Sequence, residues 1–538
     1  MVLSFLKKCF VAGVVSLVCL PLAAVAFQAW QTGSENQAFI LQNALSQYLP
    51  NSLRLVFFVI AGSSVIGVSA AWAVTHFQFA GRRSLEWLLM TPLAFPAYIM
   101  AYAYTDFLDV AGPVQSALRD LTGLEARQLF FPEIRSLAGA ACILSLCLYP
   151  YVYVLARAAF VKQARSQIDA ARLLGASPLR IFFTIALPGA WPHIVLGVIL
   201  VTMETLSDFG TVSYFGIQVF STGIYNAWTG YGDVVSAAQL SLILVTPVLI
   251  LIFMEKSFRY RVDFSSGDDD RSFPTETLSG IRSLLCSFFC SIPVFLGFFI
   301  PLIILLKLAL FDTDGIHYVS LADTMISPFL NTLLFAGIAA LCAIILAAAI
   351  FFAIRRIPSA SRSALQTAVT YGYGFPGIII GLGFLIVTGW WKTLGGPLLT
   401  GSFIFLIFAY IVRFLAIPVN AIEAAYAKIG AGISDAASLL DRNPVSRFLK
   451  IDLPLILPSL SGAALILFIE VMKELPITLI LRPFDYDTLA IRVYNLASDE
   501  RLAEAALPSL LIVAAGTVSV FLLTRFTHKK KDAETSAP

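Results

Sequence analysis

Long apolar runs separated by short polar intervals organise the chain. A run of about 20 apolar residues is long enough to cross a bilayer as a helix. The pattern predicts about twelve such spans, at roughly 9–30, 53–76, 85–104, 136–160, 193–215, 234–254, 284–308, 331–353, 364–389, 402–422, 459–481 and 505–524. The sequence therefore predicts an all-α integral membrane protein.

The longest polar interval inside the chain, residues 255–282, is rich in charged and turn-forming residues and divides the chain in two. It separates a first half, residues 1–254, from a second half, residues 283–525, and a short basic tail follows at 526–538. The first apolar run resembles a secretory signal, but it is long enough to span. We expect it to be a retained first span.

The two halves repeat each other. Ile168 to Pro192 recurs 266 residues later as Ser434 to Pro458, with matching acid, paired alanines, isoleucine and Leu-Pro. Earlier in each half, Asn51 and Pro96 correspond to Asn331 and Pro376 at an offset of 280. The first half therefore carries about 14 extra residues, which we assign to the loop from 106 to 135. Matches at fixed offsets are the signature of an internal repeat.

Composition excludes several classes of protein. Hydrophobic residues make up 58% of the chain and charged residues only 13%, against about 25% in soluble proteins. The net charge of +3 gives no reason to expect a nucleic-acid partner. Neither the seven cysteines nor the four histidines show the spacing of a metal or catalytic site. The chain also lacks the glycine-rich loop that binds ATP phosphates, so we expect no enzymatic activity and no bound cofactor.

Basic residues predict the orientation. Lys7, Lys8 and the cluster Lys529–Lys531 lie at the two ends, and many other Lys and Arg flank the two repeated segments. Because Lys and Arg collect on the cytoplasmic side of membrane proteins, we expect both repeated segments and both termini to be cytoplasmic.

Each repeated segment is predicted to form a short helix, a turn and a second short helix that leads into a span. Asp169 and Asp435 suit the positive end of a helix dipole, and Gly175 with Pro178 favours a turn. Pro188 and Pro454 are expected to end the second helix before the apolar run begins. A single such segment could be an ordinary amphipathic loop, but its duplication favours a shared function.

These segments resemble the "EAA" loops of bacterial ABC-importer permeases, with Asp in place of Glu in both copies. In the second copy Asp441 replaces the glycine, so the turn there needs another residue, such as Asn443. The resemblance implies two tandem type I ABC-importer permease repeats in a bacterial inner membrane. Their coupling loops, 161–192 and 423–458, would each insert a helix into one subunit of a cytoplasmic ATPase dimer.

The resemblance also implies the partners and the coupling residues. ATP and Mg would bind to the partner ATPase, and a periplasmic solute-binding protein would deliver the solute. The residues carried over from the motif are Asp169, Ala170, Ala171, Gly175, Ile185, Leu187, Pro188, Asp435, Ala436, Ala437, Ile451, Leu453 and Pro454.

Four acids lie within the predicted spans that follow the two segments. Glu204 and Asp208 in the first half match Glu470 and Glu474 in the second, again at an offset of 266. A spacing of four would place each pair on one face of a helix, and a carboxylate at mid-bilayer costs at least about 2.5 kcal/mol. Two interpretations stay open. The acids line a cation path, with Asp208 and Glu474 as transient metal contacts, or they form a structural network neutralised by Lys473 or Arg413.

The phrases Met203 to Gly216 and Val493 to Val513 resemble ferric-iron importer permeases, so ferric ion is the expected cargo. Thiamine, a polyamine or an inorganic anion is the alternative within the same family. A proton-coupled secondary transporter is the rival outside it, although that reading gives the duplicated loops no purpose.

Overall fold

The computed structural model describes residues 2–31, 37–163, 165–261, 276–311, 318–354, 359–397, 399, 401–427 and 443–535. The chain forms two compact units. Unit 1 contains Met1–Leu41, Ile224–Val245 and Ile316–Asn495, and unit 2 contains Gln42–Gly223, Thr246–Gly315 and Leu496–Pro538. Residues 262–275 of the predicted linker and 428–442 of the predicted second coupling loop lie outside the described residues.

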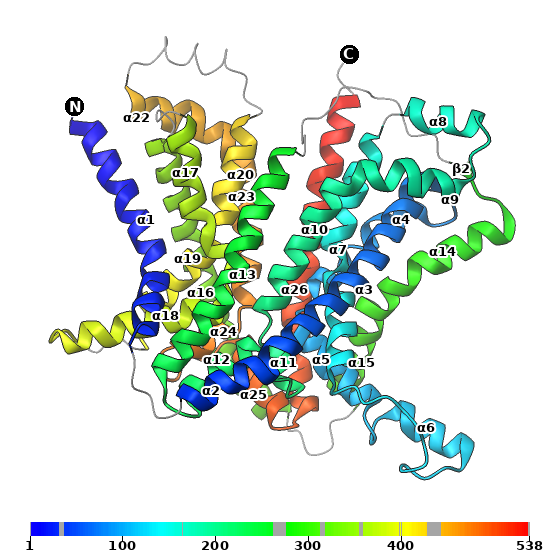
Figure 1. Ribbon diagram of the computed structural model, residues 1–538, viewed down its shortest axis with the longest axis horizontal. Helices are drawn as coiled ribbons and strands as arrows, with labels where there is room; N and C mark the ends of the chain where they lie inside the picture. The colour runs from blue at the N-terminus through cyan, green and yellow to red at the C-terminus, as the bar shows by residue number, and fades with distance from the viewer. Residues whose placement is uncertain are drawn as a thin grey trace. The chain divides into compact units, whose positions relative to one another are not determined.

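Unit 2 is built mainly from the first half of the sequence. Its elements are η1 (Ala44–Tyr48), α3 (Leu49–His76), β1 (Phe77–Gln78), α4 (Arg82–Leu88), η2 (Thr91–Ala94), α5 (Ala97–Leu108), α6 (Pro113–Thr122), α7 (Leu137–Lys162), α8 (Arg165–Leu173), α9 (Pro178–Ile181), η3 (Phe182–Ala186), α10 (Leu187–Ser207), α11 (Gly210–Tyr214), β2 (Glu276–Thr277), α14 (Gly280–Val294), η4 (Phe295–Phe299), α15 (Ile300–Leu310) and α26 (Leu502–Thr535). Helix α26 continues into the predicted basic tail. In Figure 1, α6 and α8 lie at opposite ends of this unit.

Unit 1 is built mainly from the second half. It holds α1 (Val2–Ala29), α16 (Tyr318–Ile354), α17 (Ser359–Thr370), η5 (Tyr371–Gly374), α18 (Gly377–Thr393), α19 (Phe403–Phe414), α20 (Ala416–Ala427), α22 (Pro444–Arg447), η6 (Phe448–Asp452), α23 (Leu453–Met472) and α24 (Pro476–Leu481). Four helices contribute residues to both units: α2 (Gln37–Asn43), α12 (Phe220–Thr229), α13 (Val234–Arg261) and α25 (Leu489–Ser498).

The helices confirm an all-α integral membrane protein. Nine helices of the described residues are long and apolar enough to cross a membrane, or eleven if each of two bent helix pairs forms one span. One bent pair, Leu365–Gly374 with Gly377–Thr393, turns by 107°, where Pro376 is the extended N-cap of α18. Pro96 likewise precedes α5 in the first half. The third predicted span of each half is therefore a broken helix, because proline removes a backbone donor and stops the preceding helix.

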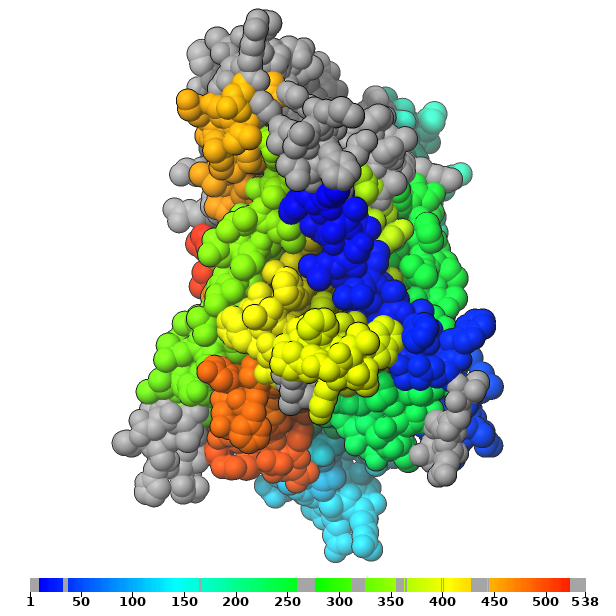
Figure 2. Space-filling model, turned by 90° about the vertical axis from the view of Figure 1, so that its left-hand side faces the viewer, coloured from blue at the N-terminus to red at the C-terminus, as the bar shows by residue number. Residues whose placement is uncertain are grey.

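The spatial units do not follow the sequence halves. Helix α1 packs in unit 1 with the second-half helix α18, and α14 and α15 belong to unit 2. The rings of Phe27 and Trp390 meet edge to face with centroids 5.2 Å apart. Figure 2 shows α1, in blue, bordering the yellow segment that contains α18. The first helix of each sequence half thus belongs to the unit built mainly from the other half.

Close contact between α1 and α18 depends on Gly383. A Cβ at this position would lie 2.4 Å from the carbonyl oxygen of Pro21 and 2.6 Å from its Cβ. Small residues allow helix backbones to approach in membranes, where van der Waals packing holds helices together. A side chain at position 383 would therefore push α1 away from α18.

We expect Gly383→Ala to lower the free energy of unfolding in detergent by about 1–3 kcal/mol, the usual cost of overpacking. Gly389→Ala in the same helix is the matched control, since a Cβ there meets nothing within 4 Å. That control should be neutral, or more stable by up to about 1 kcal/mol, because alanine favours helix. Equal thermal unfolding of the two variants would contradict the close contact.

Candidate functional site

The first repeated segment forms the helix, turn and helix that the sequence predicted. Helix α8 ends in a turn at Gly175, whose φ of +78° suits glycine. The amide of Ala176 donates to the carbonyl of Ala171 at 3.0 Å, which closes this turn. Ser177 then caps α9, its hydroxyl accepting from the amide of Arg180 at 3.3 Å. The local sequence thus fixes the direction of α8 relative to α9.

The second short helix does not end at Pro188 or Pro454, which corrects the expectation from the sequence. Instead, α9 continues through the π turn η3 into α10, and α22 continues through η6 into α23. In each π turn the amide donates five residues back, from Leu187 to Phe182 and from Leu453 to Phe448. Proline would clash with a carbonyl four residues earlier in an α-helix. The wider π turn removes that clash and keeps the helix continuous.

The same device occurs at every π turn of the described residues. The turns η1, η3, η4 and η6 are each followed, two residues later, by a proline in the first turn of the next helix: Pro50, Pro188, Pro301 and Pro454. The turns η3 and η6 stand 266 residues apart, which is the offset of the sequence repeat. From the second short helix onward, the described residues of the two repeated segments therefore share a structure as well as a sequence.

A solvent-exposed apolar patch lies on the first segment. We call Leu173 and Leu174 the leucine patch, since these residues are 89% and 88% exposed. Leu173 and Leu174 lie outside all of the candidate spans found among the described residues. Exposed apolar side chains that gather outside the membrane mark an interaction surface. The motif comparison missed the patch as a contact surface, although both leucines recur as Leu439 and Leu440.

The structure describes the coupling residues of the first copy taken from the motif and three of those of the second copy. Ala170 and Pro188 are exposed, and Asp169, Ala171, Ile185 and Leu187 are half-buried. In the second copy, Ile451 lies in η6, and Leu453 and Pro454 begin α23. Asp435, Ala436 and Ala437 lie outside the described residues. Their role in docking stays a prediction.

An aromatic brace joins each segment to neighbouring spans. In unit 2 the ring of Trp72 lies 5.3 Å from Phe182 and 5.4 Å from Phe160. In unit 1 the corresponding contacts are Phe352 with Phe448 at 5.2 Å and Phe351 with Tyr426 at 4.9 Å. Edge and tilted aromatic pairs contribute about 0.5–1.5 kcal/mol each beyond the area they bury. The brace fixes the π turn of each half against the spans. The pair of Trp72 and Phe182 recurs at the two offsets of the repeat as Phe352 and Phe448, whereas Tyr426, which corresponds to Phe160, contacts the neighbouring Phe351.

The acids do not share one helix face, which corrects the expectation from their spacing. Helix α10 ends at Ser207 and α23 at Met472, so Asp208 and Glu474 lie beyond the helix ends. Asp208 accepts hydrogen bonds from the Thr211 hydroxyl at 3.0 Å and the Val212 amide at 3.1 Å. Both carboxylates therefore cap the short helix that follows, as Glu474 does by accepting from the Ile477 amide at 3.2 Å.

The two cations considered from the sequence pair with the acids of the second half. The Arg413 Nε lies 3.4 Å from a Glu474 oxygen, and the Lys473 Nζ lies 2.8 Å from a Glu470 oxygen. Glu204 is half-buried on α10. Within the described ranges, no group of three or more His, Cys, Asp and Glu residues could hold a metal ion. A role of the acids in a cation path stays a prediction.

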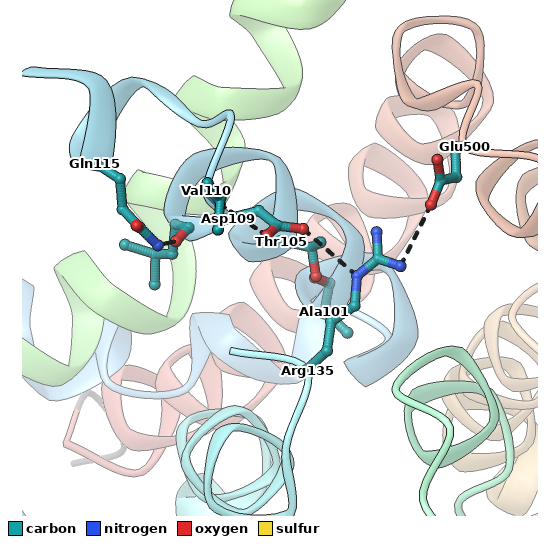
Figure 3. Close-up of polar contacts among 8 residues, drawn as sticks. Ala101, Thr105, Asp109, Val110, Gln115, Arg135 and Glu500 are labelled. Atoms are coloured by element: carbon teal, nitrogen blue, oxygen red, sulfur yellow. Dashed lines mark hydrogen bonds and ion pairs between the residues drawn. The ribbon is translucent and has the colours of Figure 1, made fainter. Parts of the chain in front are cut away.

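The extra residues of the first half form an extension at the end of unit 2 opposite α8. It contains α6, and Arg135 holds in place the segment that leads from α6 back to α7 (Figure 3). The Arg135 guanidinium lies 3.6 Å from a carboxylate oxygen of Asp109 and 3.5 Å from one of Glu500. Gln115 donates to the carbonyl of Leu108 at 2.8 Å, which holds α6 against the end of α5.

The chain is similar to membrane transport proteins. Residues 63–262 match the family described as binding-protein-dependent transport system inner membrane component. The chain is 25% identical, over 95% of its length and 96% of the relative, to the Fe(3+)-transport system permease protein FbpB 2 of Haemophilus influenzae. It is 23% identical, over 89% of its length and 71% of the relative, to the ferric transport system permease protein FbpB of Actinobacillus pleuropneumoniae. A putative 2-aminoethylphosphonate transport system permease protein, PhnU of Salmonella typhimurium, is 28% identical over 32% of this chain and 60% of the relative.

Proposed function

Because this chain belongs to the inner-membrane permeases of binding-protein-dependent ABC importers, we propose that it carries ferric ion from a periplasmic solute-binding protein to the cytoplasm. One observation favours this cargo above others. The two relatives whose names specify ferric iron align over 95% and 89% of the chain. The phosphonate relative aligns over only 32% of it.

Energy comes from a separate ATPase dimer on the cytoplasmic side. The loops around Asp169–Pro188 and Asp435–Pro454 each dock into one ATPase subunit, and the leucine patch supplies apolar contact for the first. Closure of the ATPase dimer moves the loops, and the continuous helix from α9 through η3 into α10 passes this movement into the membrane. The permease thereby alternates between outward-open and inward-open states.

The orientation of the chain in the membrane follows from the same partners. Both loops and both termini face the cytoplasm, and the α6 extension, at the other end of unit 2, faces the periplasm. The excess of Lys and Arg around the loops supports this arrangement. An inorganic or organic anion is the second candidate cargo, supported by the phosphonate relative.

Uptake by the permease with its co-purified ATPase and binding protein, reconstituted in vesicles, tests the proposal. Radioactive ferric ion should accumulate only when ATP is supplied on the cytoplasmic side, and labelled 2-aminoethylphosphonate should not. ATP-dependent uptake of the phosphonate instead of iron would change the proposed cargo but not the proposed ATP-driven mechanism. If iron uptake does not depend on ATP and a protonophore abolishes it, the ABC mechanism is rejected in favour of proton coupling.

A further inference from the structure

The end of the predicted linker is attached to the membrane helix next to the first coupling loop. Strand β2 pairs in parallel with β1, with Glu276 opposite Phe77 and Thr277 opposite Gln78. The amide of Leu278 donates to the carbonyl of Gln78 at 2.9 Å. Further along, the Ala80 amide donates to the Ser283 hydroxyl at 3.0 Å. The chain that enters the second half is therefore fixed to the end of α3.

Arg172 of α8 reaches this junction. Its Nη2 lies 3.0 Å from Nε2 of His76 and 3.7 Å from a carboxylate oxygen of Glu276. A guanidinium only donates hydrogen bonds, so Nε2 accepts and the imidazole is neutral in this contact. The His76 ring is 1% exposed and stacks on Trp72 with centroids 4.1 Å apart. One side chain thus joins α8 to the end of α3 and to the linker.

This contact distinguishes the first loop from the second. The aromatic brace occurs in both halves, but the position of Arg172 is occupied by Ser438 in the second repeat, and serine is too short to make a comparable bridge. Ser438 lies outside the described residues, so the bridge is described for the first segment. In the first segment the arginine joins α8 to the end of the linker, which pairs with the end of α3.

We propose that Arg172 is a positioning residue that holds α8, and with it the leucine patch, against Glu276 of the linker and His76 of α3. The linker is then a strut for the first coupling loop as well as a tether between the halves. This inference rests on the proposed docking of an ATPase at that loop. Movement of α8 reaches α14 through β2 in addition to reaching α10 through the π turn.

A charge exchange tests the strut in the complete complex of permease, ATPase and binding protein. Arg172→Glu and Glu276→Arg should each lower the number of solute molecules transported per ATP hydrolysed by about threefold or more, since each places like charges together. The double variant should restore at least half of the wild-type ratio. Arg282→Glu, an equal charge change at an exposed position of α14, should leave the ratio unchanged.

A second measurement needs no partner. Hydrogen exchange of residues 165–173 in the full-length permease alone should be faster in both single variants and return toward wild type in the double variant. Absence of rescue in both measurements would overturn the strut. A wild-type complex in which hydrolysis is unrelated to transport would reject the proposed function, and the exchange experiment would still decide whether Arg172 holds α8.

Discussion

Changing Leu173 and Leu174 together to aspartate is expected to weaken binding of the ATPase partner by about 100-fold or more. Both residues are almost fully exposed where α8 ends, since Leu173 is its last residue and Leu174 follows it. An aspartate at either position would lose the apolar burial that a leucine gains in a partner's groove. Two contacts of about 2 kcal/mol each are enough for this effect. Co-purification of the ATPase with tagged permease, followed by titration of the purified subunits, measures the loss.

The α6 extension offers a matched control. Leu121 is 84% exposed at the end of unit 2 opposite α8 (Figure 1). Leu121→Asp introduces the same charge at an equally exposed leucine and should leave ATPase binding at the wild-type level. If the Leu173→Asp, Leu174→Asp variant still binds normally while it is folded, the docking surface does not include the leucine patch.

Arg413→Leu is expected to lower the free energy of unfolding by about 3–5 kcal/mol, the usual result of removing one partner of a buried ion pair. The side chain of Glu474 is only 5% exposed, and that of Arg413 is 12% exposed. Gly377 makes room for the pair, since a Cβ there would lie 2.2 Å from Arg413 Nη1 and 2.6 Å from Glu474 Oε1. Without the arginine, the carboxylate stays buried with its charge uncompensated.

Thermal or denaturant unfolding in detergent measures this cost. The double variant Arg413→Leu, Glu474→Leu removes both charges and should recover most of the lost stability. If Arg413→Leu is as stable as wild type, the ion pair does not contribute this stability. Transport by the stable double variant then decides whether cargo needs Glu474, since normal iron uptake would remove this acid from the cation path.

Most of what the sequence could predict came from its internal repeat. Matching residues at an offset of 266 located the two repeated segments, and the offset of 280 paired Pro96 with Pro376. The sequence placed these prolines inside continuous spans, whereas the structure breaks the helix at both. The spacing of Asp208 from Glu204 failed as a guide, because the helix ends between them without a proline in the first half. There the carboxylate itself caps the next helix, and this capping depends on a backbone turn that periodicity does not reveal.

The packing partner of α1 could not be predicted either. Lipid tails are as apolar as the side chains of a span, so hydropathy says where a helix crosses but not which helix it meets. The decisive contact is local and geometric, between Gly383 and the backbone of Pro21. The π turns show the opposite case, because each stands two residues before a proline and could be sought by that spacing in other spans.

The placement of α1 in unit 1 also sets the order of events during synthesis. The ribosome makes α1 first, but its partner α18 begins at Gly377, nearly 350 residues after α1 ends at Ala29. At about 5–20 residues per second, α1 waits for on the order of 20–70 s before its partner exists. During that interval the helix is accessible to chaperones and proteases of the membrane. A polypeptide cut at the linker would leave both fragments waiting in the same way, each unable to mature until the other had been inserted.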